Sequence, residues 1–223
     1  MNSMIKRIIT LCVGLSIMSL GVAFSIKASL GTSPISSMPY VTGHISGLSV
    51  GTTTIIINWI FVIIQILILR KKYQIFQLFQ IPGAVIFGVM IDICGFLIGG
   101  INCGSYLQQW IVCAAGILFV GFGVSLEVKA NLITTPGEGI VLAICKVLPV
   151  KFGNMKVAFD VALVCGSIIL SLIFLGAVDG VREGTVAAAV CVGLLAKQFG
   201  RFLNKIDVNE SEDSSKNAAE SNA

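Results

Sequence analysis

Two short motifs that combine hydroxyl side chains with proline are the stretches best suited to bind a solute. Thr32, Ser33 and Pro34 form the first, and Thr134, Thr135 and Pro136 form the second, 102 residues later. A hydroxyl caps free backbone N–H groups and proline suits the first helical position, so each motif predicts a helix start. In a membrane those N–H groups must be satisfied by protein, water or a ligand. Two starts that face one cavity favour an anionic or carboxylate-bearing solute. The alternative is that the hydroxyls only cap their own helices.

Lys27 and Lys129 are the only charges that occur at matching positions of the two motif copies. They are candidates to neutralise an anion at the mouth of such a cavity. The alternative is that each lysine lies at the end of a membrane span and extends its ammonium group to the lipid headgroups.

Three further polar residues lie inside apolar stretches. Asp92 follows the apolar run from Phe87, and a carboxylate at the centre of a span costs about 2.5–3.5 kcal/mol, so it should face the protein interior. It either binds a cation, relays a proton or forms structural hydrogen bonds. Asn58 and Asp160 occupy one repeat position, eight residues into corresponding spans, and either line the pathway or hold helices together.

Two glutamates distinguish the second half of the chain from the first. Glu127 and Glu138 have only Ser25 and Ser36 as counterparts. Glu138 falls in the first turn of a short helix, where a carboxylate favours the positive helix end, so a capping role is the preferred interpretation.

The elements that position these residues are repeated in the sequence. Lys27 to Pro34 matches Lys129 to Pro136 at five of eight positions, and the match continues at three glycine pairs, with one residue skipped before the last: Gly21 and Gly123, Gly51 and Gly153, and Gly83 and Gly184. Such self-similarity predicts two homologous membrane repeats. We place them at residues 1–100 and 101–206.

Six apolar runs reach the length of about 20 residues that a membrane span needs. They predict an all-α polytopic membrane protein. Two intervening segments, Ser33–Ser46 and Thr135–Leu148, are shorter, and at about 1.5 Å per residue each covers only about 20 Å. Each half therefore contains three transmembrane helices and one half-helix. The six runs are Ile8–Ile26, Gly51–Leu69, Phe76–Gly99, Tyr106–Val128, Phe152–Leu175 and Val181–Leu203.

The distribution of lysine and arginine predicts how the halves are oriented. If the short segments do not cross and the N-terminus is cytoplasmic, thirteen of these residues lie inside and only Lys27 and Arg182 lie outside. If the short segments cross, the split is nine to six. Positive charge accumulates on the cytoplasmic side, so the first arrangement is preferred. It makes the halves inverted repeats and places both termini in the cytoplasm.

The composition excludes several classes of protein. Hydrophobic residues make up 56% of the chain and charged residues only 12%, against about 25% charged in soluble domains. The net charge is +4, but residues 207–223 contribute −4, and we predict that this acidic stretch is a disordered cytoplasmic tail. No basic stripe with interleaved aromatics indicates nucleic-acid binding. His44 is the sole histidine and no C-x-x-C motif occurs, so we predict no metal site, no cofactor and no enzymatic activity.

The end of the first span carries one spaced motif, made of Gly21, Ala23, Ala28, Leu30, Gly31 and Pro34. With this motif the chain resembles the YczE/YitT-type integral membrane proteins of bacteria, and the resemblance covers about residues 5–205. That family is largely uncharacterised, so the resemblance implies a bacterial inner-membrane protein and supplies no substrate.

The expected function is that of a secondary transporter or facilitator, embedded in the lipid bilayer, for a small solute with an anionic group favoured. Inverted three-span repeats with half-helices are a recurring transporter design. The alternative is a non-transporting membrane accessory protein that supports a partner enzyme or complex.

Overall fold

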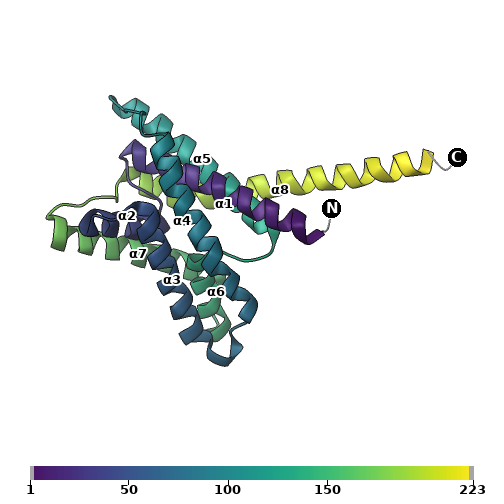
Figure 1. Ribbon diagram of the computed structural model, residues 1–223, viewed down its shortest axis with the longest axis horizontal. Coiled ribbons are helices and arrows are strands. Elements are labelled where there is room, and N and C mark those ends of the chain that lie inside the picture. The colour runs from purple at the N-terminus through teal and green to yellow at the C-terminus, as the bar shows by residue number, and fades with distance from the viewer. Residues whose placement is uncertain (1–2, 221–223) are drawn as a thin grey trace.

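The computed structural model describes the backbone of residues 3–220 and the side chains of residues 4–203. Within that part the chain is all-helical, and six of its helices are long and apolar enough to cross a membrane. Both predictions are confirmed. Figure 1 shows these long helices crossing one another as a bundle. Their bounds are α1 Ser3–Ala28, α3 Val50–Leu69, α4 Gln80–Leu97, α5 Tyr106–Ala130, α7 Phe152–Leu175 and α8 Glu183–Glu220.

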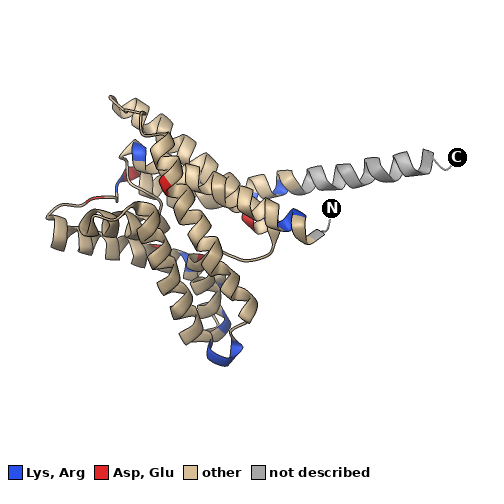
Figure 2. Cartoon of the chain, viewed as in Figure 1, with Lys and Arg blue, Asp and Glu red and all other residues tan. Residues whose placement is uncertain are grey.

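Two short helices fill the predicted half-helix segments. α2 covers Pro34–Ser46 and α6 covers Pro136–Val147, and each has proline at its first position. Two 3-10 helices, η1 Arg70–Lys72 and η2 Ile75–Phe79, connect α3 to α4. Figure 2 shows long uncharged stretches of helix, with lysine and arginine gathered at the turn after α3. The prediction of a disordered tail falls on residues 207–223, outside the part of the chain whose side chains are described.

The centre of the bundle is a close crossing of α1 and α5. A Cβ atom on Gly21 would lie 2.7 Å from the carbonyl oxygen of Gly116, and one on Gly123 would lie 2.7 Å from that of Gly14. Only glycine permits backbones to approach so closely. Since Gly14 meets Gly123 and Gly21 meets Gly116, the two helices run antiparallel.

Each short helix packs against a long helix from the other half of the chain. α2 contacts α7, where the hydroxyls of Ser37 and Ser167 are hydrogen-bonded at 2.9 Å. α6 contacts α3, where the Gln65 amide donates to the carbonyl oxygen of Pro136 at 2.9 Å. These exchanged contacts hold the starts of α2 and α6 together in the middle of the molecule.

Candidate solute-binding site

The central cavity, of about 240 Å³, lies where the first turns of α2 and α6 meet. Ser33 and Pro34 line it from α2, and Thr135 and Glu138 line it from α6. The two turns touch directly, because a Cβ atom on Gly137 would overlap the Ile35 side chain. The free N–H groups of two helix starts therefore lie near one cavity.

The polar and apolar linings of the central cavity come from different helices. Lys156 and Asp160 of α7 form an ion pair at 2.6 Å with side chains 26% and 20% exposed, and Asn58 of α3 lines the same cavity. Among the described residues, every charged or hydrogen-bonding lining side chain comes from α2, α3, α6, α7 or the residues before α2 and α6. The wall formed by α1, α4, α5 and α8 is wholly apolar: Met18, Val22, Phe87, Val120, Val124, Ala188, Ala189, Val192 and Gly193.

Glu138 lines a second cavity in addition to the central one. The second cavity has a volume of about 300 Å³, is bordered by Gln77 and Gln80 and lies toward the end of the bundle that carries Arg70–Lys72. We call this second space the basic-end cavity. No hydrogen bond to the Glu138 carboxylate is found among the described side chains. Burial raises the pKa of this carboxyl above its ordinary value, an effect that Lys156 opposes and Asp160 reinforces.

Glu127 has a role that the sequence interpretation missed. Its side chain is buried, and Oε1 accepts a hydrogen bond from the backbone N–H of Thr135 at 2.6 Å. A carboxylate from α5 therefore caps α6. The signal in the sequence was an acid in an apolar span with only Ser25 at the matching position.

The alternative in which the motif hydroxyls cap their own helices is wrong for Ser33 and Thr135. Neither side chain makes a capping hydrogen bond. The Ser33 hydroxyl instead donates to the hydroxyl of Ser36 at 3.1 Å. The hydroxyls of Ser33 and Thr135 therefore line the central cavity and do not cap their own helices.

Six of the predicted site residues are not among those that line the central cavity, and four of these lie away from it. Lys27 donates from Nζ to the carbonyl oxygen of Gly99 at 2.8 Å. Thr32 is buried, and its N–H donates to the carbonyl oxygen of Gly180 at 3.0 Å. Lys129 lies on the last turn of α5. The fourth is Asp92, described next.

Asp92 makes structural hydrogen bonds at the start of α3. One carboxylate oxygen accepts from the Ser49 hydroxyl at 2.6 Å and the other from the backbone N–H of Gly51 at 2.8 Å. Of the three roles left open by the sequence, this geometry favours the structural one. Within residues 4–203, moreover, no three His, Cys, Asp or Glu side chains gather as metal ligands.

Thr134 and Pro136 lie just outside the central cavity. Both line a narrow gap against α1, α3 and α4, which also contacts Asn58 and Thr135, and Thr134 reaches the basic-end cavity as well. The structure thus brings Ser33, Pro34, Asn58, Thr135 and Asp160 together at the central cavity and leaves Thr134 and Pro136 at its edge.

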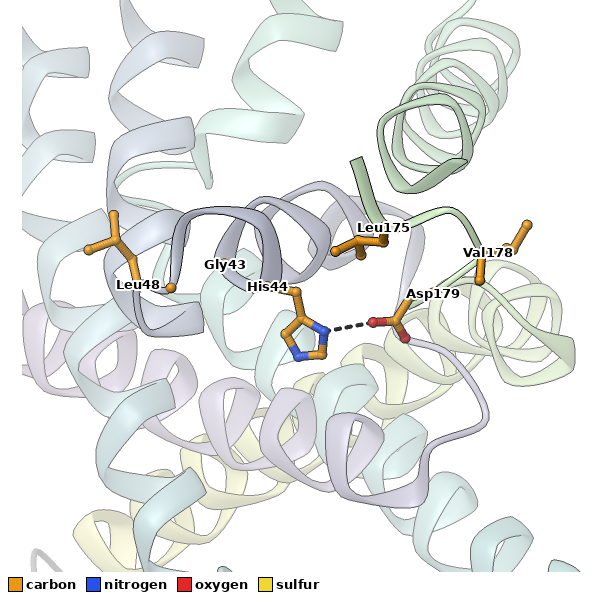
Figure 3. Close-up of a pocket in the computed structure, with 8 residues that line it drawn as sticks. Gly43, His44, Leu48, Leu175, Val178 and Asp179 are labelled. Carbon is orange, nitrogen blue, oxygen red and sulfur yellow. Dashed lines mark hydrogen bonds and ion pairs between the residues drawn. The ribbon is translucent and has the colours of Figure 1, made fainter. Parts of the chain in front are cut away.

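The opposite end of the bundle carries a hydrogen-bonded pair of side chains that the sequence did not predict. His44 Nδ1 lies 2.6 Å from Asp179 Oδ2 at an open surface pocket, as Figure 3 shows. The ring of Tyr40 lies 4.4 Å from that of His44, and burial, with a further contribution from Asp179, raises the pKa of Tyr40. The pair joins the end of α2 to the loop between α7 and α8.

Comparison with known proteins identifies the family. The model of a family of unknown function, DUF6198, matches residues 5–201. The uncharacterized protein YyaS of Bacillus subtilis (strain 168) is 28% identical over 189 residues, which cover 84% of this chain and 89% of YyaS. The uncharacterized membrane protein YczE of the same strain is 28% identical over 187 residues, covering 82% and 80%. The predicted family resemblance is confirmed. No solved structure gives a significant match.

Proposed function

The chain belongs to the DUF6198 family, a family of unknown function, and we propose that it is a secondary transporter or facilitator of a small solute that carries an anionic group. The observation that carries this proposal is the meeting of two half-helix starts at one central cavity. In transporters built from repeats, such starts lie at the repeat interface and bind the solute there. The neighbouring basic-end cavity, which shares Glu138, supplies a route from one end of the bundle.

The contacts between α1 and α5 support an arrangement of two inverted repeats. The two repeats are offset by 102 residues in this region, so Gly14 corresponds to Gly116 and Gly21 corresponds to Gly123. The contact of Gly14 with Gly123 therefore becomes the contact of Gly116 with Gly21, which also exists. Ile35 likewise meets Gly137, its own counterpart. Contacts that exchange in this way are expected when a two-fold axis relates the two repeats. Equivalent helices that run antiparallel are expected when one repeat is inverted relative to the other.

The positive-inside rule supports a cytoplasmic assignment for the end that carries Arg70–Lys72. Lys146 and Lys151 flank the connection from α6 to α7. In this assignment the protein lies in the bacterial inner membrane with both termini inside. The basic-end cavity then faces the cytoplasm, and the His44–Asp179 pair lies on the outer side.

The two halves would rock around the central cavity and expose it to each side in turn. The helix starts attract the anionic group of the solute because each carries about half a positive charge. Asn58 and Ser36 supply neutral hydrogen-bonding groups on the same wall.

Cysteine accessibility tests this proposal without knowledge of the solute. The seven native cysteines are replaced, and Thr54, a buried residue that lines the central cavity, is changed to cysteine. Alternating access predicts that a membrane-impermeant maleimide labels Thr54→Cys in both right-side-out and inside-out vesicles. A matched Ile63→Cys variant on the exposed apolar side of α3 should be labelled in neither. Labelling of Thr54→Cys from one side only would remove the transport proposal.

An accessory role is the second candidate, and the exposure of two helices favours it. In the apolar 18-residue stretch of each span, only 17% of the residues of α7 and 6% of those of α8 are buried inside the protein. The buried share in the other four spans is 33–44%. A membrane partner would cover this apolar face. Recovery of one stoichiometric partner after purification in mild detergent would support the accessory role, and recovery of the chain alone would count against it.

A further inference from the structure

We infer that the central cavity binds a small zwitterion with an apolar body, of the chemical class of the aliphatic amino acids. The amino group lies at Glu138, the carboxylate at the starts of α2 and α6, and the apolar body against the wall formed by α1, α4, α5 and α8. This inference rests on the proposed function and names the class of its solute.

The first argument is that Glu138 lacks a partner. The Glu138 side chain is half-buried at the cavity wall, and no hydrogen bond to its carboxylate is found within the described part of the chain. The cation beside it, Lys156, is already paired with Asp160 at 2.6 Å. Glu127, which also lies at the start of α6, is a second acid and cannot pair with Glu138 as a cation would. A buried carboxylate is costly unless it is paired and hydrogen-bonded. An ammonium group on the solute would supply both the charge and the donors.

The second argument is that a simple cation does not fit the rest of the polar wall. The starts of α2 and α6 direct N–H groups and positive helix ends toward the same region. A solute with only an amine would leave these donors unpaired. A solute with only a carboxylate would meet Glu138 and Asp160, which carry its own sign of charge. A zwitterion satisfies both sets of groups.

The third argument concerns the opposite wall. The lining side chains from α1, α4, α5 and α8 are apolar without exception among those described, and include Met18, Phe87 and Val120. A solute without an apolar body would leave this wall in contact with water. Each buried methylene group improves affinity about fourfold. Aliphatic side chains are therefore preferred over glycine.

The experiment compares four probes by calorimetric titration of the purified full chain in detergent. L-Leucine carries both charges, whereas isopentylamine and isocaproate keep its carbon skeleton and only one charge each. Glycine keeps both charges and lacks the apolar body. We expect leucine to bind at least about tenfold more tightly than each of the other three probes. Each of those probes leaves either polar groups of the cavity without a partner or the apolar wall in contact with water.

Two variants locate the amino group. Glu138→Gln should weaken leucine binding at least about tenfold while isocaproate binds as before or better. Glu183→Gln is the matched control, because Glu183 is exposed at the start of α8 and pairs with Arg182 at 3.3 Å. It should bind leucine like the unaltered chain. If Glu138→Gln does not fold, leucine should still protect Thr54→Cys from labelling, and isopentylamine should not.

Three outcomes would overturn the inference. Isocaproate that binds as tightly as leucine means an anion site, and isopentylamine that does so means a cation site. If neither leucine nor glycine binds, the cavity does not take zwitterions of this class. In each case, labelling of Thr54→Cys from both sides would leave the transport proposal intact, so the two failures are distinguishable.

Discussion

The pair α3–α4 and the matching pair α7–α8 differ in how closely they pack. Gly51 of α3 lies directly against Gly88 of α4, and Asp92 of α4 accepts hydrogen bonds from the start of α3. Gly153, the counterpart of Gly51, faces open space, as does Gly193, which stands where the repeat places Asp92. Gly193 instead lines the central cavity. The two helix pairs occupy matching places in the repeat, yet only α3 and α4 are in close contact at these positions. A few side chains and glycines therefore decide whether a pair packs tightly.

The short helices show a second difference between the halves. The end of α2 is joined to the neighbouring loop by His44 and Asp179. At the end of α6 the counterpart of His44 is Lys146, and the basic-end cavity lies beside this helix, with Glu138 and Leu142 in its lining. The end of α2 is therefore held to a neighbouring loop by a side-chain pair, whereas α6 is bordered along its length by the basic-end cavity.

The largest effect is expected from adding one methyl group to the close pair. Gly51→Ala places a Cβ atom on the backbone of Gly88 and should lower the free energy of unfolding by about 3 kcal/mol. Gly153→Ala adds the same atom to open space and should change it by less than about 1 kcal/mol. Denaturant unfolding in detergent measures both. Equal effects would show that the two helix pairs are packed alike.

Glu127 and Ser25 provide the next comparison. Glu127→Ala removes the charged acceptor of the Thr135 N–H and should cost about 2 kcal/mol. Ser25→Ala removes only a hydroxyl that donates within its own helix, to Gly21 at 3.1 Å, and should cost well under about 1 kcal/mol. The same unfolding assay tests this, and a larger cost at Ser25 would contradict the assignment of Glu127 as the cap of α6.

Asp92 and Asp160 should separate stability from binding. Asp92→Ala removes the carboxylate that caps α3 and should cost about 1.5 kcal/mol of stability while solute binding is unchanged. Asp160→Asn should weaken solute binding with a smaller loss of stability, because it breaks the ion pair in the central cavity. Calorimetric titration beside thermal unfolding measures the two quantities. The opposite pattern would move the solute site toward Asp92.

Glu138 should make stability depend on pH in a way that its counterpart Ser36 cannot. The pKa of Glu138 is raised in the folded protein, so folding favours the protonated form. Its contribution is fully present below about pH 4 and is lost as the pH rises through the higher, folded-state pKa. Relative to the unaltered chain, Glu138→Gln should therefore gain stability as the pH rises above about 4. A difference that does not vary with pH would contradict the raised pKa.

The smallest effect on stability is expected at the His44 end. Asp179→Asn breaks a pair whose side chains are 46% and 39% exposed, and exposed pairs contribute at most about 1 kcal/mol. The informative measurement is accessibility, since loss of the tie should speed labelling of Thr54→Cys from the outer side. An unchanged labelling rate would mean that the pair does not restrain this end.

Much of the fold could be predicted because its causes are local. Long apolar runs indicate membrane spans whatever their neighbours, and proline after a hydroxyl residue marks a helix start. The predicted segments 33–46 and 135–148 accordingly agree with α2 and α6 to within one residue at each end. The candidate site was predicted less completely. Asp92 and Asp160 look alike in sequence, as acids within apolar runs, yet only Asp160 lines the central cavity.

The sequence by itself determined the six spans, the two short helices and the proline-led starts, because hydropathy, length and local backbone preference act within a single segment. Only the tertiary structure decided that Glu127 caps a helix eight residues away, that Asp92 caps α3, and that Glu138 lines two cavities without a hydrogen bond from any described side chain. Those roles depend on which helices pack together. In an apolar bundle that packing is set by close contacts such as those of Gly14, Gly21 and Gly51, which no single segment reveals.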